Sequence, residues 1–379
     1  MIEQLPGKIE LHSQKVAGWL EGRTARLLLP ITASVDIRNA AYKSAVVDTN
    51  LFPAGFNNLC ETFAANAAQA FGRFLAKNHP GVKRIHLYPE PHTRNRFYLE
   101  NVRSLTSILH QAGFETSAGL KLEPADLILA NNDFTGGVPE EIARSKIPVL
   151  PPPSAGWHRR RKSDHFQILG GLIQELAGLL EIDPWLLFPL WSLESAIDLE
   201  SENCLKRLQR SADELLTRIA QKHREHGIHE EPFLFVKNNA GTYGLGVLPI
   251  DSGNELLSLS RRLRDKLRYS KGGRPVTELL LQEGIPTADT LDGHPIEPVV
   301  YLIGGEPVGT FFRIHGEKNA RENLNAPGMR FACICYHQIE PPTASLSDPN
   351  KENLFRTADL LAKVASLAAA IEIGTARQS

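Results

Sequence analysis

Cysteine is scarce in this chain of 379 residues, which has four cysteines, at positions 60, 204, 333 and 335. They are too few and too scattered for a disulfide framework, which indicates a reducing compartment, and we expect the cytoplasm. An excess of either charge is also missing, because 42 Lys and Arg stand against 43 Asp and Glu. The composition therefore lacks the electrostatic footprint of a protein that binds nucleic acid or an anionic membrane.

Long apolar runs are absent too. The most apolar long segment, residues 170–191, contains two glutamates, a glutamine and an aspartate, and this excludes a membrane-spanning helix. Glu3 and Glu10 interrupt the apolar core that a signal peptide would need, so we expect no export. With 42% hydrophobic residues and no internal repeat, the chain has the material for a globular protein of two or three domains.

What the chain does contain is a glycine-rich turn directly after a strand-like run. Residues 233–249, FLFVKNNAGTYGLGVLP, place Lys237 at the end of the apolar run and continue with Gly241, Gly244 and Gly246. Glycine lets backbone amides approach a polyanion, and a lysine before such a turn can hold a phosphate. The spacing is neither that of a P-loop nor that of a dinucleotide fingerprint. It predicts a hairpin loop over nucleotide phosphates, with a plain turn as the alternative.

The first part of the chain, from about residue 25 to 150, alternates between strand-like and helix-like segments. We expect strands at 45–47, 82–88, 127–130 and 147–150, and helices at 57–77, 98–112 and 139–145. This order predicts a parallel sheet with helices on its faces, within an α/β (α+β) fold. Prolines 151–153 mark a boundary, so we expect a Rossmann-like, substrate-binding domain at 1–155 and a second domain at 156–379.

In a parallel sheet, ligands bind beyond the carboxyl ends of the strands. Three polar segments, at 34–39, 48–58 and 90–96, are expected as loops there. A guanidinium next to a helix N-terminus can hold a carboxylate, as Arg94 and Arg96 would. The alternative is that these arginines are solvated side chains on surface loops. The candidate substrate-binding residues are Arg38, Asn58, Arg94 and Arg96.

The second half has a specific order of elements. A basic segment containing Lys162 precedes helices expected at 167–180 and 203–226, and strand 279–281 leads into Gln282-Glu283-Gly284-Ile285. A hairpin at 298–303 and 308–314 turns through two glycines and ends at Arg313, and the segment 321–329 reads RENLNAPGM. Together with Lys237 and its glycine turn, this order resembles the ATP-grasp ligases of glutathione synthesis over residues 156–329. The whole chain is most similar to the small proteobacterial family of glutamate-cysteine ligases.

The resemblance implies binding of ATP and Mg²⁺, with glutamate and cysteine as substrates. Arg313 and Arg321 would face the transferring phosphoryl group as catalytic residues, and residues 239–246 would form a mobile loop over the triphosphate. The basic segment at 159–162 would then feed a phosphate site, although it could also be a solvated face. The implied nucleotide-binding residues are Lys162, Lys237, Asn239, Gly241, Thr242, Tyr243, Gly244, Gly246, Gln282, Glu283 and Ile285.

One departure from the family concerns the magnesium ligands. The usual fold carries a late acidic strand after a helix, but here the helix expected at 355–373 is followed only by a short tail. Either the 321–329 segment supplies the ligands or the site is reduced. The candidates implied are Glu297, Glu322, Asn323 and Asn325, with Glu340 as a further one.

The sequence leaves three functions open. The first is formation of γ-glutamylcysteine through an acyl phosphate. The second is glutathione synthetase or another amino-acid ligase of this class, and the third is a non-catalytic ATP-binding protein. A homo-oligomer is compatible with each of these functions.

Overall fold

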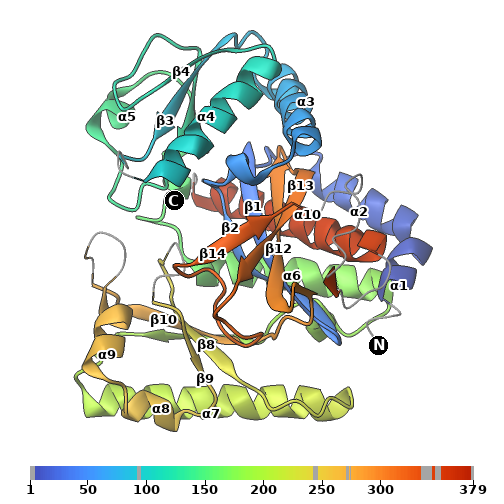
Figure 1. The fold of residues 1–379 in the computed structure, drawn as a ribbon, viewed down its shortest axis with the longest axis vertical. Coiled ribbons are helices and arrows are strands. Elements are labelled where there is room, and N and C mark those ends of the chain that lie inside the picture. The colour runs from blue at the N-terminus through green and yellow to red at the C-terminus, as the bar shows by residue number, and fades with distance from the viewer. Residues whose placement is uncertain are drawn as a thin grey trace.

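The computed structural model describes residues 5–91, 95–241, 246–269, 273, 275–333, 344–345 and 351–376. Its strands form a central antiparallel sheet, a parallel sheet above it and a second antiparallel sheet below it (Figure 1). The predicted mixed α/β fold with a parallel sheet is confirmed.

The central sheet combines strands from both ends of the chain, in the order β14-β13-β12-β1-β2. All its pairings are antiparallel, and the short strands β11 and β15 extend its margin. Gly304 and Gly305 make the turn between β12 and β13 with positive φ values of 57° and 81°, which favour glycine. The strands are β1 (Thr32–Ala40), β2 (Lys43–Asn50), β11 (Thr290–Leu291), β12 (His294–Ile303), β13 (Glu306–His315), β14 (Met329–Ala332) and β15 (Ala344–Ser345).

The structure corrects the prediction for residues 34–39, which form part of strand β1 instead of a loop. The strand expected at 45–47 is part of β2, which pairs with β1 in the central sheet and does not join the parallel sheet. Val35 and Ile37 join the apolar core on one face, so the alternating Ser34, Asp36 and Arg38 point to the other. The expected domain division after residue 155 stays a prediction; the central sheet takes strands from both sides of it.

The parallel sheet has the order β4-β3-β5-β6, so β4, which the sequence analysis did not predict, takes the place of the strand expected at 45–47. Phe71, Leu87 and Leu109 are among the side chains that pack helices against it. Its elements are β3 (Arg84–Pro89), β4 (Glu115–Ala118), β5 (Leu127–Asn131), β6 (Val149–Leu150), α3 (Glu61–Asn78), α4 (Arg96–Gln111) and α5 (Glu140–Arg144).

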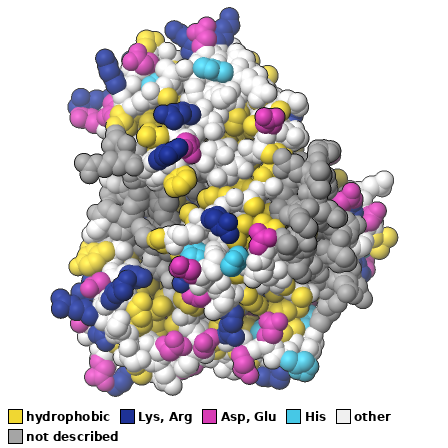
Figure 2. All heavy atoms as spheres, viewed as in Figure 1, with side chains coloured by type: hydrophobic (Ala, Val, Ile, Leu, Met, Phe, Trp, Pro, Cys, Tyr) yellow, Lys and Arg dark blue, Asp and Glu magenta, His cyan; other side chains and the backbone are white. Residues whose placement is uncertain are grey.

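The second antiparallel sheet has the order β7-β10-β8-β9 and packs on one face against α7, whose leucines form a stripe at helical spacing. Basic side chains gather over α9 at the lower left of the molecular surface (Figure 2). The elements are β7 (Trp191–Ser195), β8 (Leu234–Asn238), β9 (Leu248–Ile250), β10 (Glu278–Glu283), α7 (Glu202–Glu225), α8 (Asn254–Leu257) and α9 (Arg261–Arg268).

Four further helices are α1 (Leu5–Leu11), α2 (Ser13–Thr24), α6 (Lys162–Leu180) and α10 (Lys351–Ala376). Helix α10 is apolar nearly all round because it packs between α6 and the central sheet, where it contacts β1, β2 and β12. No helix in the described ranges has the length and apolarity needed to span a bilayer.

Candidate functional site

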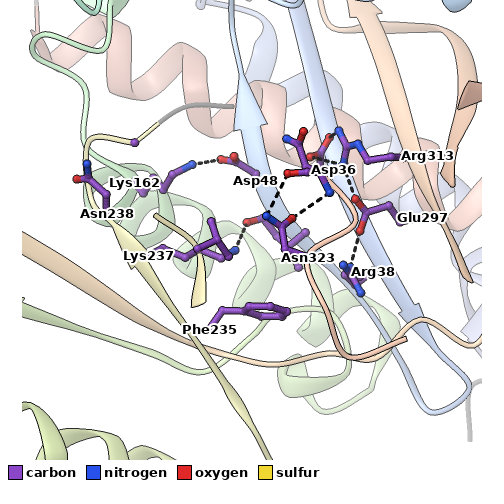
Figure 3. A pocket seen from close by; sticks show the side chains of 14 residues that line it. Asp36, Arg38, Asp48, Lys162, Phe235, Lys237, Asn238, Glu297, Arg313 and Asn323 are labelled. Carbon is purple, nitrogen blue, oxygen red and sulfur yellow. Dashed lines mark hydrogen bonds and ion pairs between the residues drawn. The ribbon is translucent and has the colours of Figure 1, made fainter. Parts of the chain in front are cut away.

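A cleft with about 610 Å³ of empty space lies between the central sheet and the second antiparallel sheet. One wall comes from β1, β2, β12 and β13, and the other from β8 and the start of α6 (Figure 3). The lining residues are Asp36, Arg38, Val47, Asp48, Lys162, Phe235, Lys237, Asn238, Gly241, Val247, Glu297, Arg313, Asn323 and Asn325.

The central-sheet wall holds a buried row of alternating charges. Glu297 of β12 lies 2.5 Å from Nε of Arg38 and also pairs with Arg313, the residue directly opposite it on β13. Nη1 of Arg313 is 3.0 Å from Oδ2 of Asp36. Burial opposes ionisation of Glu297, but Arg38 and Arg313 outweigh it and lower its pKa. Burial raises the pKa of Asp36, although Arg313 opposes this.

The opposite wall supplies two lysines that point toward β2 (Figure 3). Nζ of Lys162, the first residue of α6, lies 2.5 Å from Oδ1 of Asp48. Nζ of Lys237, near the end of β8, donates to the carbonyl oxygen of Val47 at 3.3 Å. Burial lowers the pKa of Lys237 to about 8, against the attraction of Asp48. Burial opposes ionisation of Asp48, yet the two lysines bring its pKa below its usual range.

Asn239 fixes the start of α6 from behind the cleft. Its side-chain oxygen accepts from the amide of Ser163 at 2.8 Å, and its carbonyl accepts from the amide of Lys162 at 2.8 Å. Its Nδ2 donates to Oε2 of Glu278 at 2.9 Å. Asn239 therefore satisfies two amides of the first turn of α6, and in doing so it orients Lys162.

A second buried network holds β2 against α6 and α10. Glu372 of α10 accepts from Nε of Arg160 at 2.8 Å and lies 3.1 Å from Nδ1 of His165. Arg160 donates to the carbonyl oxygen of Thr49, and Nε2 of His165 lies 3.0 Å from Oγ1 of the same residue. Burial opposes ionisation of Glu372, but Arg160 and His165 lower its pKa to about 2. This network fixes the backbone next to Asp48.

Eight of the site residues predicted from the sequence meet in this cleft, although their roles stay predictions. They come from segments as far apart as β1 and the loop after β13. They are Arg38, Lys162, Lys237, Gly241, Glu297, Arg313, Asn323 and Asn325.

Other predicted residues lie elsewhere. Arg321 donates to Asp251 at 2.6 Å and covers the ring of Phe233. Glu322 turns its carboxylate to Lys318 and to a backbone amide of its own loop. Arg96 is 89% exposed on α4, and Asn58 lies in the turn Phe56–Asn58, outside the cleft lining.

The residues expected around a purine are buried near the end of β10. Both oxygens of Glu283 lie 2.8 Å from Nζ of Lys43, and they also accept from Nε1 of Trp185, so this carboxylate is fully engaged. Ile285 belongs to the apolar cluster that contains Trp185. Gln282 is completely buried, and neither polar atom of its side chain has a hydrogen-bond partner within the described residues. It lies opposite Phe235 of the cleft lining.

Several predicted residues lie outside the described residues, namely Arg94, Thr242, Tyr243, Gly244 and Glu340. Gly246, which follows the glycine turn, has a φ of +67°, and a Cβ there would come within 2.9 Å of the carbonyl oxygen of Lys266. Glycine is therefore required at this position.

The sequence analysis missed six lining residues, namely Asp36, Val47, Asp48, Phe235, Asn238 and Val247. The alternation of Ser34, Asp36 and Arg38 with apolar residues was the available signal, because it is typical of a half-buried strand. No group of three His, Cys, Asp or Glu suited to a metal ion occurs within the described ranges. The oxygen donors of this cleft are instead a mixture of carboxyl and amide groups.

Comparison with known proteins shows that the chain is similar to a family model and to solved structures. The model of the glutamate-cysteine ligase family matches residues 7–123 and 118–373. The crystal structure of "Putative gamma-glutamylcysteine synthetase" from Methylobacillus flagellatus KT, at 1.90 Å resolution, has 34% sequence identity and a TM-score of 0.88. The match covers 98% of this chain and 96% of that chain. No curated protein matches.

Proposed function

The chain belongs to the glutamate-cysteine ligase family, and on this premise we propose that it forms γ-glutamylcysteine from glutamate and cysteine with ATP and Mg²⁺. An amide cannot form directly from a carboxylate, so the γ-carboxylate is first converted to an acyl phosphate. The cysteine amine then attacks the acyl carbon and releases phosphate.

The observation that supports this proposal is the charge of the cleft. Four cationic side chains, Arg38, Lys162, Lys237 and Arg313, face three carboxyl groups there. Lys237 has only a backbone carbonyl as its hydrogen-bond acceptor among the described residues, and burial lowers its pKa. An ammonium that is partly removed from water and has no carboxylate of its own favours an anionic ligand, and the phosphates of a nucleotide would fit.

The adenine ring would lie toward the end of β10. Gln282 is buried there with an unpartnered amide, and such a group is costly unless a ligand pairs with it. Phe235, its cross-strand neighbour, offers an apolar surface in the cleft. Glu283 would not contact the nucleotide, because Lys43 and Trp185 already occupy both of its oxygens.

Mg²⁺ prefers carboxylate and amide oxygens, so the donor set of the cleft fits it. We assign it to Asp36, Asp48 and Asn325 in place of Glu322, whose carboxylate faces Lys318. The acidic strand that related ligases carry after their last helix would then be β1 and β2, since α10 packs against both of them. When bound, the metal ion would supply neutralising charge for the phosphate oxygens.

The side chains of the chain itself would bind and orient. Lys162 and Lys237 would neutralise the phosphates, and Arg313 would stabilise charge on the transferring phosphoryl group. Glu297 would hold Arg38 and Arg313 in position between the sheets. Burial of this row limits the access of water, which would otherwise hydrolyse an acyl phosphate.

Incubation of the purified protein with ATP, Mg²⁺, glutamate and cysteine tests the proposal. We expect ADP, phosphate and the dipeptide in equal amounts. ADP formation with a different acid and amine would instead indicate another ligase of this class. Nucleotide binding without substrate-dependent ADP formation would indicate a non-catalytic protein.

A further inference from the structure

A second pocket opens next to the cleft, where the parallel sheet meets the ends of β8 and β10. Its lining includes Thr135 from the loop after β5, Trp157 and Arg161 before α6, and Glu278 at the start of β10. Asn238 lines both this pocket and the first cleft, so the two adjoin at this residue.

Arg161 and Glu278 form a long ion pair in this pocket. Nε of Arg161 lies 3.5 Å from Oε2 of Glu278, a separation longer than a normal hydrogen bond, and both side chains are about one third exposed. Oε2 also accepts from Asn239. Among the described residues, nothing donates to Oε1 of Glu278 or accepts from Nη2 of Arg161. The pair therefore keeps an acceptor on Glu278 and a donor on Arg161 that a ligand can use.

A buried hydroxyl adds to this arrangement. Thr135 is 5% exposed, and its Oγ1 has no hydrogen-bond partner within the described part of the chain. Buried polar atoms are nearly always paired, so an orphaned hydroxyl on the wall of a pocket indicates a ligand that is absent from the structure. Trp157, 4% exposed, contributes an apolar wall beside it.

We propose that this pocket binds the α-ammonium and α-carboxylate of the amino acid whose distal carboxylate is activated. The inference rests on the function proposed above. Glu278 receives the ammonium, and Arg161 with Thr135 receives the α-carboxylate. The side chain of the amino acid then passes Asn238 and brings its distal carboxylate to the first cleft.

The chemistry decides which of the two substrates belongs here. The amine of cysteine must lose a proton and attack, so a carboxylate that holds it as an ammonium ion would oppose the reaction. Both α groups of glutamate remain unchanged, because its γ-carboxylate is the one that reacts. A site built for a zwitterion therefore fits the carboxylate donor and not the amine acceptor.

Steady-state kinetics of ADP formation with Arg161→Gln, Glu278→Gln and Thr135→Val test the assignment. We expect the KM for glutamate to rise roughly tenfold or more in the two charge variants, because each loses a charge-assisted hydrogen bond. The KM values for ATP and cysteine should stay within about twofold. Arg218→Gln, a change at an exposed arginine of α7 that lines neither pocket, is the control with unchanged values.

Calorimetric titration with glutamate, N-acetylglutamate and glutamate α-amide separates this inference from the proposed function. The assignment is supported if the wild type binds glutamate but neither derivative, and if Arg161→Gln no longer binds glutamate. This holds even if the wild type forms no dipeptide. Thr135→Val, which nearly conserves side-chain volume, covers the case in which a charge variant does not fold. Unchanged KM values in all three variants, an effect on the cysteine KM instead, or no binding of glutamate to the wild type would overturn the assignment.

Discussion

Lys237 lies near the end of β8 and donates to the carbonyl oxygen of Val47, while Asp48, Lys162, Arg38 and Glu297 set the field around it. Its pKa is lowered to about 8, so it is charged below that pH and neutral above it. If its charge holds a phosphate, nucleotide affinity falls as the pH rises. Between pH 7 and pH 9 we expect the Kd for ATP to increase by about tenfold.

Lys237→Arg is the matched variant, because a guanidinium stays charged over this range. Its Kd should be nearly independent of pH, and Lys237→Ala should bind weakly at every pH. Fluorescence titration with a labelled nucleotide at three pH values measures all of these constants. An equally steep pH dependence in Lys237→Arg would mean that another group titrates.

At the scale of elements, a buried ion pair joins the two antiparallel sheets. Lys43 begins β2 and Glu283 ends β10, and both side chains are at most 1% exposed. Removal of one partner leaves an uncompensated buried charge, which costs about 3 to 5 kcal/mol. Glu283→Gln should therefore lower the free energy of unfolding by several kcal/mol in urea titrations.

The same variant distinguishes a structural role from nucleotide recognition. We expect its Kd for ATP to stay within about twofold of the wild-type value at temperatures where it remains folded. Gln282→Leu should do the reverse, with a weaker Kd and little loss of stability, because it removes an amide that has no partner among the described residues. A large change of Kd in Glu283→Gln would contradict this division of roles.

Local patterns in the sequence were sufficient to predict the elements that such patterns mark. The helices α3, α4, α6 and α7 follow apolar stripes that the sequence displays directly. Strand β1 could not be placed, because its pairing with β12 joins residues more than 250 positions apart. The family resemblance assigned Glu283 to the nucleotide, and nothing near it in sequence reveals its ion pair with Lys43.

At the scale of the whole molecule, early and late segments of the chain meet beside the cleft. Glu372 near the end of α10 holds Arg160 and His165, and these hold Thr49 beside Asp48. The pKa of Glu372 is about 2, below its ordinary value of 4.5. The stability that its charge contributes is complete above pH 4.5 and is lost as the pH falls toward 2.

Glu372→Gln should lower the free energy of unfolding at pH 7 by about 3 kcal/mol, because it removes a buried charged partner. At pH 3.5 the difference from the wild type should narrow by about 1 kcal/mol. Urea titrations at the two pH values measure both quantities. Glu214→Gln, at an exposed position of α7, is the control and should have little effect at either pH. If the difference in free energy of unfolding between Glu372→Gln and the wild type is the same at both pH values, ionisation of Glu372 does not contribute to stability in this way.

The pairing of β1 with β12 also determines when the cleft can first form during synthesis of the chain. A ribosome releases Asp36 and Asp48 early, but Arg313 and Asn325, on the same wall, emerge only near the end of translation. A nascent or truncated polypeptide would carry the hairpin β1–β2 without its neighbour strands. Such a fragment could not assemble the cleft, so under the proposed function unfinished copies would not hydrolyse ATP.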